Sequence, residues 1–305
     1  MAKKKPAKKS SASTGFEIEF KQSAYFIASM KTLAKWCEDM VMKPDAKNLT
    51  IEAADASNTA MVQIIIPKSK FERYIIGKEH SQLVVSFTDF RKVMERGYNE
   101  DILNLKYDYP QQKLITKFKR DTGRTRTFRL AALEEEYKDL EFAKIRKTEF
   151  PIMFNIDPKV FEDILKDAEI YGETITIFTQ SDDTDIGFKG EAPIGDFEGV
   201  LGTEELTNLI IEKGGLTTLA IGKLKKVLDL KSLTEELTVN TGHNYPIILI
   251  FTLKNKMEIL YAQAPRVDQE EFDEIEDIKE AIEENINGEA DEIIEEEEVI
   301  EEVEE

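Results

Sequence analysis

The chain has 305 residues, of which 41% are apolar, and a formal net charge of −20 at pH 7. This length fits about two domains, and the single cysteine, Cys37, excludes an internal disulfide and favours a reducing compartment. Met1 is followed by lysines and no apolar run approaches eighteen residues, so we expect neither a secretory leader nor a membrane span.

The charge is unevenly distributed along the chain. Residues 1–15 carry five lysines and no acid, whereas residues 268–305 carry 21 acidic residues and one lysine. The segment between them, 16–267, therefore keeps a net charge of only −5. We expect the basic arm (1–15) and the acidic tail (268–305) to be disordered, because their compositions are those of solvated tails.

The first half, 16–130, alternates strand and helix patterns. A helix is predicted from Ser23, with apolar residues at helical spacing as far as Met40, and a second helix at 87–96 begins at a capping-box-like Ser86. Predicted strands are 16–21, 49–54, 59–66, 71–76, 82–85, 102–107, 113–118 and 124–130.

The second half, 150–267, repeats this plan. One helix starts at Asp157-Pro158 and stops at Gly172, and another runs from Thr218 to Lys231. Predicted strands are 150–156, 174–179, 186–190, 197–201, 206–212, 237–240, 247–253 and 257–261. The order predicts a duplicated α+β fold, with two similar domains of two helices each on antiparallel sheets. Residues 131–149, of which ten are charged, form the predicted connector.

Catalytic motifs do not occur in the sequence. It has no metal-ligand spacing of Cys and His, no phosphate-binding glycine loop and no nucleophile elbow. His80 and His243 are the only histidines, and turn chemistry accounts for the acidic pair Asp182-Asp183. We therefore expect no catalytic residues, no metal and no cofactor.

Basic side chains lie opposite the apolar stripe of all four predicted helices. They are Lys31, Lys35, Arg91, Lys92, Arg96, Lys159, Lys166, Lys223, Lys225, Lys226 and Lys231. On one helix this is an ordinary solvated face. On all four helices of a duplicated fold it favours one basic surface, suited to contacting phosphates without reading sequence.

Five stretches carry a family resemblance: the run from Phe16-Glu17 through the first predicted helix, and residues 53–63, 97–101, 245–247 and 261–267. They are similar to the proliferating-cell-nuclear-antigen type of DNA sliding clamp, and the similarity spans about 16–267. The resemblance implies a trimeric ring of duplicated subunits, with helices lining a central hole and sheets forming the outer wall. Such clamps are not enzymes. They are placed around duplex DNA by a clamp loader and act as processivity factors.

The resemblance also implies partners and a location. Clamps tether DNA polymerase, flap endonuclease and ligase through short peptide motifs, and a tethered enzyme gains effective concentration. They are intracellular and act at chromosomal DNA, in the cytoplasm of archaea or the nucleus of eukaryotes. We expect no membrane partner.

Three sets of residues match functional positions of the family. The DNA-facing candidates are Lys31, Lys35, Arg91, Lys92, Lys166, Lys223 and Lys226. The subunit-interface candidates, on two edge strands of opposite charge, are Arg124, Arg126, Phe128, Asp196, Glu198 and Val200. The peptide-pocket candidates are Ala54, Leu133, Leu140, Phe142, Pro246, Tyr261, Ala264 and Pro265.

Two features depart from the family pattern. Glu95, Glu162 and Asp163 fall on helix faces where clamps tend to be basic. In the connector, Leu140-Glu141-Phe142 replaces a short apolar-proline stretch, and Ala54 replaces a usual methionine.

Alternatives remain open at this point. A clamp-fold scaffold that binds partner peptides without encircling DNA would explain the acidic helix residues, and a small-molecule enzyme would need a polar pocket with perturbed acids. The sequence does not separate a homotrimer from one subunit of a heterotrimer. The lysine arm has three open roles: DNA contact, nuclear address or solvated tail.

Overall fold

The computed structural model describes residues 15–77, 82–134, 140–180 and 184–266. The described residues as far as Pro265 form one compact unit, and the account below concerns that unit. The predicted acidic tail, and the predicted basic arm apart from Gly15, lie outside the described residues. No helix in the described ranges is long and apolar enough to cross a membrane.

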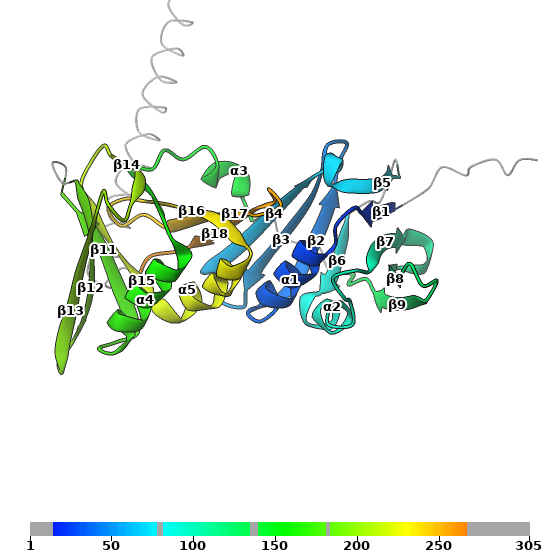
Figure 1. Cartoon of the computed structure of the whole chain (residues 1–305), viewed down its shortest axis with the longest axis horizontal. Helices are drawn as coiled ribbons and strands as arrows, with labels where there is room; N and C mark the ends of the chain where they lie inside the picture. Colours follow the sequence, from blue (N-terminus) through cyan, green and yellow to red (C-terminus); the bar gives the residue numbers. More distant parts are fainter. Residues whose placement is uncertain (1–14, 78–81, 135–139, 181–183, 267–305) are drawn as a thin grey trace, which may run out of the picture. The chain divides into compact units, whose positions relative to one another are not determined.

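Eighteen strands and five α-helices make up the described part of the chain (Figure 1). The strands of the first half are β1 (Phe16–Phe20), β2 (Cys37–Pro44), β3 (Asn48–Asp55), β4 (Ala60–Pro67), β5 (Phe71–Ile76), β6 (Leu83–Ser86), β7 (Ile102–Asp108), β8 (Lys113–Lys119) and β9 (Thr125–Ala131). Those of the second half are β10 (Ile152–Ile156), β11 (Thr174–Thr179), β12 (Asp185–Ala192), β13 (Gly195–Gly202), β14 (Thr207–Ile211), β15 (Gly215–Ala220), β16 (Thr234–Thr241), β17 (Ile247–Leu253) and β18 (Glu258–Gln263). The helices are α1 (Ala24–Leu33), α2 (Phe87–Met94), α3 (Phe142–Ile145), α4 (Pro158–Glu169) and α5 (Ile221–Leu228), and short 3₁₀ turns include η3 (Asp229–Ser232).

The strand order shows that the fold is duplicated. One sheet has the order β5-β1-β7-β8-β9, a second β13-β12-β11-β15, and the third β14-β10-β16-β17-β18-β4-β3-β2-β6. Adding nine to each strand number in the first sheet gives the first five strands of the third sheet, in the same order. Subtracting nine from each strand number in the second sheet gives the last four strands of the third sheet. The nine-stranded sheet therefore joins one sheet from each half at the antiparallel pair β18–β4.

Strand registers align the two halves residue by residue. The cross-strand row Ile18–Leu105–Thr116–Phe128 of the first half corresponds to the row Phe154–Val239–Leu249–Tyr261 of the second. In the remaining sheets, the row Val84–Val41–Glu52–Gln63 corresponds to Thr218–Thr176–Lys189–Glu198. Phe128 is thus equivalent to Tyr261, and Glu198 to Gln63.

The long helices pack on one side of the sheets in the order α4, α5, α1, α2 (Figure 1). Each buries an apolar stripe at helical spacing, as α4 does with Phe161, Ile164 and Leu165. Two predicted helix starts are confirmed by their caps. The Ser86 hydroxyl accepts a hydrogen bond from the Asp89 N–H at 3.3 Å, and Asp157 Oδ1 accepts one from the Lys159 N–H at 2.7 Å.

The second predicted helix ends at Met94, two residues before Arg96, and two other predicted helices included residues that lie in strands. The first ends at Leu33, and Cys37 and Met40 lie in strand β2, because their spacing fits a strand buried on both faces as well as a helix. The fourth starts at Ile221 rather than Thr218. Thr218 belongs to β15, where its hydroxyl lies 2.9 Å from that of Thr176 on β11.

Candidate nucleic-acid interface and partner surface

The predicted DNA-facing cations all lie in or beside the helix layer. Lys31 is on α1, Lys166 on α4 and Lys226 on α5. Lys35 follows α1 directly, and Lys223 is in the first turn of α5. Because the four helices pack in one row, these residues from distant parts of the sequence share one layer.

Most of these cations already have a carboxylate partner. Lys35 pairs with Asp229 at 2.7 Å, linking α1 to η3. The other exposed pairs are Arg91–Glu95 at 2.9 Å, Lys92–Asp89 at 2.8 Å, Lys166–Glu162 at 2.8 Å and Lys166–Asp163 at 3.0 Å. Exposed pairs contribute only about 0–1 kcal/mol each, so a phosphate can exchange with the carboxylate at little cost. Among described residues, Lys31 and Lys226 have no carboxylate partner.

Helix α4 is the acidic member of the row. Glu162 accepts hydrogen bonds from Lys166 and Lys231, and these bonds hold the pKa of its carboxyl below the usual range. The pKa of Lys166 is raised for the same reason, by its bonds to Glu162 and Asp163. The acidic residues that depart from the family pattern therefore neutralise the lysines beside them.

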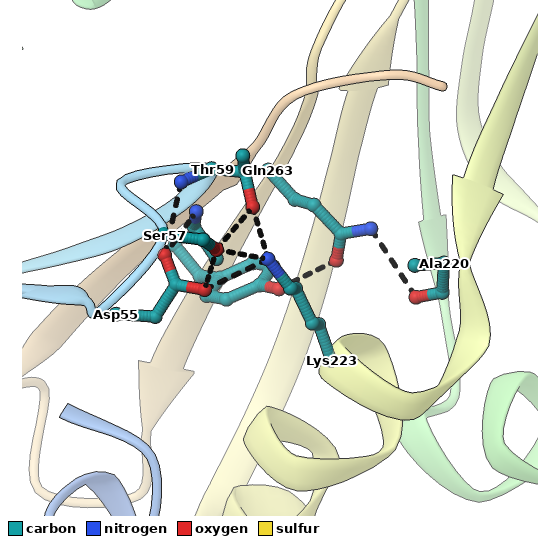
Figure 2. Close-up of polar contacts among 8 residues, drawn as sticks. Asp55, Ser57, Thr59, Ala220, Lys223 and Gln263 are labelled. Carbon is teal, nitrogen blue, oxygen red and sulfur yellow. Dashed lines mark hydrogen bonds and ion pairs between the residues drawn. The ribbon is translucent and has the colours of Figure 1, made fainter.

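Lys223 has a structural role in the joint between the two halves (Figure 2). Its Nζ lies 2.7 Å from Asp55 Oδ2 and 2.9 Å from Ser57 Oγ, and it also contacts Thr59 Oγ1. Asp55 Oδ1 in turn accepts the N–H groups of Thr59 and Ala60, each at 2.9 Å. One lysine of the second half thus ties α5 to the β3–β4 turn of the first half.

A second contact beside Lys223 strengthens this joint (Figure 2). The Gln263 Nε2 donates to the carbonyl of Ala220 at 3.2 Å, and its Oε1 accepts from the Tyr261 hydroxyl at 2.6 Å. The start of α5 is therefore bound to β18, the strand that pairs with β4.

The electrostatics of Asp55 reflect the same contacts. Partial burial alone would raise the pKa of its carboxyl, but hydrogen bonds from Lys223, Ser57 and the Ala60 N–H outweigh burial and lower it. The ionised carboxylate is thus favoured in the folded chain, and its stabilising effect depends on pH.

The predicted interface strands β9 and β13 each lie at the end of a sheet and have one paired neighbour among described strands. On β13, Asp196, Glu198 and Val200 point to solvent. On β9, Phe128 is partly buried against the core, and Arg124 lies in the preceding turn.

Arg126 faces inward. Its guanidinium pairs with Asp101, whose side chain is fully buried, and lies over the rings of Tyr98 and Phe118. Arg120 holds the other oxygen of Asp101 at 3.0 Å. A buried carboxylate with two arginines fixes this part of β9 through contacts within the same chain.

The predicted peptide-pocket residues divide between two faces of β18. Phe142 on α3 is buried against Ile248, Leu260 and Ala262. Tyr261 is fully buried on the opposite face, where its ring meets Trp36 edge-on at 5.6 Å. Leu140 packs beside Phe142, Ala264 is exposed, and Ala54, Leu133, Pro246 and Pro265 are half-buried. The eight residues therefore do not form one continuous lining.

The end of the connector is held by hydrogen bonds from polar residues that were not predicted from the sequence. Arg146 Nε donates to Gln63 Oε1 at 2.8 Å, and Arg146 Nη2 lies 3.0 Å from Glu258 Oε1. Gln63 also donates to the buried Glu52 at 2.8 Å, and Lys43 pairs with Glu52 at 2.7 Å. The one signal in the sequence was Gln63, a polar residue inside the apolar strand MVQIII.

The described ranges contain no group of three His, Cys, Asp or Glu side chains placed to hold a metal ion.

Comparison with known families gives one match over most of the chain. The sequence model of the Rad9 family matches residues 26–283.

Individual relatives are DNA polymerase sliding clamps. The one from Thermococcus gammatolerans is 22% identical over 254 residues, which are 83% of this chain and 99% of that protein. The one from Pyrococcus furiosus is 20% identical with the same coverage. Among solved structures, PCNA from Thermococcus kodakaraensis superposes with a TM-score of 0.72 and 20% identity, over 82% of this chain and all of that one. These comparisons confirm the predicted clamp fold and the resemblance from which it came.

The joint at Lys223 generates a prediction about stability. Replacing Lys223 with Met removes the cation and leaves Asp55 partly buried, so we expect a loss of about 1–2 kcal/mol at pH 7. The pKa of Asp55 is lowered by folding, so the contribution is complete above its unfolded pKa, about 3.9. This contribution to stability is lost as the pH falls through the lower pKa that Asp55 has in the folded chain. The difference in unfolding free energy between the variant and the parent should shrink over that range.

Urea unfolding at pH 7 and pH 3 measures this difference. Lys226→Met, which changes a lysine on the same helix with no carboxylate partner among the described residues, is the control and should stay within about 0.5 kcal/mol of the parent. Equal losses for the two variants at pH 7 would contradict the role given to Lys223.

Proposed function

The chain belongs to the Rad9 family of PCNA-like clamps, and on that premise we propose that it is a DNA sliding clamp. Three copies close into a ring around duplex DNA and tether DNA polymerase and repair enzymes as a processivity factor. The role is not catalytic. The observation that carries the proposal is the pair β18–β4, which is an internal copy of the joint that a ring needs between subunits.

The duplication explains why. In one chain, β18 of the second half pairs with β4 of the first. The equivalent strands are β9 and β13, and both have a free edge in the described chain. Pairing β9 with β13 of the partner subunit repeats the internal joint, and repeating a heterologous contact with closure makes a ring. That the ring has three subunits is taken from the family resemblance.

The internal joint also gives the register. Leu260 lies opposite Gln63, and their equivalents are Thr127 and Glu198. Moving along the strands, Phe128 lies opposite Phe197 of the partner subunit, and Arg129 opposite Asp196 of the partner subunit. Arg129 and Asp196 are exposed in the single chain. This register assigns the outer charge pair to Arg129, while Arg126 serves its own subunit through Asp101.

Exposed apolar side chains support the same edge as a contact surface. Ile194 is 80% exposed in the turn before β13, and Val200 is 53% exposed on that strand. Within the chain, Trp36 contacts Tyr261. The equivalent residues are Tyr171 and Phe128, so in the proposed ring Phe128 meets Tyr171 of the partner subunit. Tyr171 lies against Gly195 at the start of β13. Covering these side chains favours association.

The helix row supports DNA passage without tight binding. Its lysines and arginines are mostly in exposed pairs, so contacts with phosphates are weak, exchangeable and dependent on salt. Retention then comes from ring closure. We place the protein inside the cell at chromosomal DNA. We also propose that a clamp loader opens the ring and that polymerase, flap endonuclease and ligase dock by short peptides near the connector.

A second candidate is a clamp-fold scaffold that binds partners without encircling DNA. The observation in its favour is the acidic helix α4, where Glu162 and Asp163 neutralise Lys166. Loading on circular DNA separates the two candidates, because a scaffold is not retained on a closed circle.

The register predicts a charge-swap rescue. Arg129→Glu should move the monomer–trimer midpoint to several-fold higher protein concentration, because it faces Asp196 of the partner subunit with a like charge. Adding Asp196→Arg should restore the parental midpoint. Light scattering over a dilution series measures both effects. Lys113→Glu, an exposed residue on β8, is the control, and failure of the double variant to recover would refute this register.

The helix row predicts a change in salt dependence. Lys31→Glu with Lys226→Glu removes the two cations that have no carboxylate partner among the described residues. We expect faster loss from circular DNA, and a slope of log affinity against log salt that is smaller by about two per subunit. Retention on nicked circular and linearised duplexes is the measurement. Parental protein that leaves both DNAs at the same rate would favour the scaffold.

A further inference from the structure

A pocket of about 320 Å³ lies where the two halves of the chain meet. The first half contributes the end of β1 and the 3₁₀ turn η1 (Lys68–Lys70), and the second half contributes the turn between β17 and β18. None of the lining residues belongs to the predicted DNA-facing, interface or peptide-pocket sets, and none lies on β9 or β13. The pocket is therefore a separate feature of the single chain.

The floor of the pocket is apolar and fixed by the core. Phe20 and Met257 line it, and both are buried. The ring of Phe20 lies 4.4 Å from that of Phe26 and meets the ring of Phe71 edge-on at 4.8 Å, centroid to centroid. Because these rings pack on one another, the floor is already formed before a ligand binds.

The rim of the pocket carries hydrogen-bond donors and no carboxylate. Its polar side chains are those of Lys21, Gln22, Ser69, Lys70 and Asn255. The side chains of Lys21, Gln22 and Ser69 make no hydrogen bond to another described residue. Asn255 Oδ1 accepts the N–H of Met257 at 3.1 Å, so the Asn255 amide nitrogen remains to donate. This set of donors suits a ligand that is rich in acceptor oxygens.

The two lysines of the rim are held next to each other. The N–H of Lys21 donates to the carbonyl of Lys70 at 3.2 Å, and Lys70 Nζ donates to the carbonyl of Asn255 at 2.6 Å across the seam. Neither lysine has an ion-pair partner in the described ranges. Neighbouring like charges repel, and an anion bound between them would turn that repulsion into attraction.

The duplication shows that the fold does not require these cations. Lys21 follows the buried Phe20 of β1, and its equivalent Asp157 follows the buried Ile156 of β10. Lys70 precedes the buried Phe71, and its equivalent Glu205 precedes the buried Leu206. The same two positions are thus acidic in the second half, where Asp157 caps α4 through the Lys159 N–H. The pair of lysines is specific to this pocket.

We propose that this pocket binds a small phosphate monoester. The phosphate dianion contacts Lys21 and Lys70, its remaining oxygens accept from Ser69 and Asn255, and its apolar substituent lies on the floor. Charge-assisted bonds to two lysines favour a dianion over a single carboxylate. The volume is at the lower end of the range of about 300–1,000 Å³ for ligand sites, which fits a small molecule rather than a segment of nucleic acid.

Binding at this position has a consequence for the chain as a whole. The ligand contacts η1 of the first half and the β17–β18 turn of the second, so it stabilises the arrangement of the two halves. A ligand that binds only the folded chain raises its unfolding temperature. This inference does not depend on the sliding-clamp function proposed above, because all the contacts lie within one chain.

The probes are phenyl phosphate, inorganic phosphate and phenol, titrated into the full-length protein by calorimetry at constant ionic strength and without DNA. We expect phenyl phosphate to bind with a Kd below about 1 mM and at least threefold more tightly than inorganic phosphate, because its ring lies on Phe20 and Met257. Phenol lacks the dianion and should not bind. Phenyl phosphate should also raise the unfolding temperature, whereas phenol should not.

Variants of the rim complete the test. Lys21→Met with Lys70→Met should weaken phenyl phosphate at least tenfold, whereas Lys113→Met with Lys117→Met, two exposed lysines of β8, makes the same charge change and should alter the Kd less than twofold. Ser69→Asp keeps both lysines and places a carboxylate at the rim, as Glu204 does at the equivalent position, and should also weaken binding at least tenfold. Circular dichroism checks that each variant is folded.

Four results would each overturn the proposal. They are a Kd for phenyl phosphate above about 1 mM, equal affinity for phenyl phosphate and inorganic phosphate, equal losses for the rim and control lysine pairs, or full binding by Ser69→Asp. Retention on circular DNA is measured separately, so failure of this site and failure of the clamp function are distinguishable.

Discussion

Backbone pairing between β18 and β4 is the contact on which the rest of this molecule depends. It makes one nine-stranded sheet out of strands from both halves, and it places α5 beside α1 in the helix row. Strand pairing satisfies the backbone polar groups at the seam. Lys223 and Gln263 add side-chain bonds at its end, and Arg146 adds bonds on the connector side. The two halves are therefore held in one arrangement.

Comparing the halves shows which residues serve the fold and which serve a site. Positions that are apolar in both, such as Phe118 and Phe251, pack in the core. Positions that differ are informative. Arg126 replaces the buried Ile259 of the other half and pairs with Asp101, and this occurs on β9, the strand with a free edge. The duplication thus acts as a reference structure contained in the same chain.

The sequence predicted most elements, because short β-branched runs and capped helices are local signals. The bounds of β5 and β11 agree with prediction, whereas Cys37 was assigned to a helix because a doubly buried strand has no alternation. Site residues were harder. Lys223 lies on a basic helix face in sequence, but its Asp55 partner is 168 residues away. Arg126 likewise faces inward because it pairs with Asp101. Phe142 is buried because it packs on β17 and β18, which lie far along the chain.

The bonds of Arg146 have a consequence for mechanics. Its two partners, Gln63 on β4 and Glu258 on β18, stand on opposite sides of the seam between the halves. Any change in the angle between the two halves must therefore strain or move Arg146 and the end of the connector around it. Because linkage is reciprocal, a ligand that prefers one position of the end of the connector also favours one angle between the two halves. Arg146 is thus one side chain through which the seam and the end of the connector contact each other.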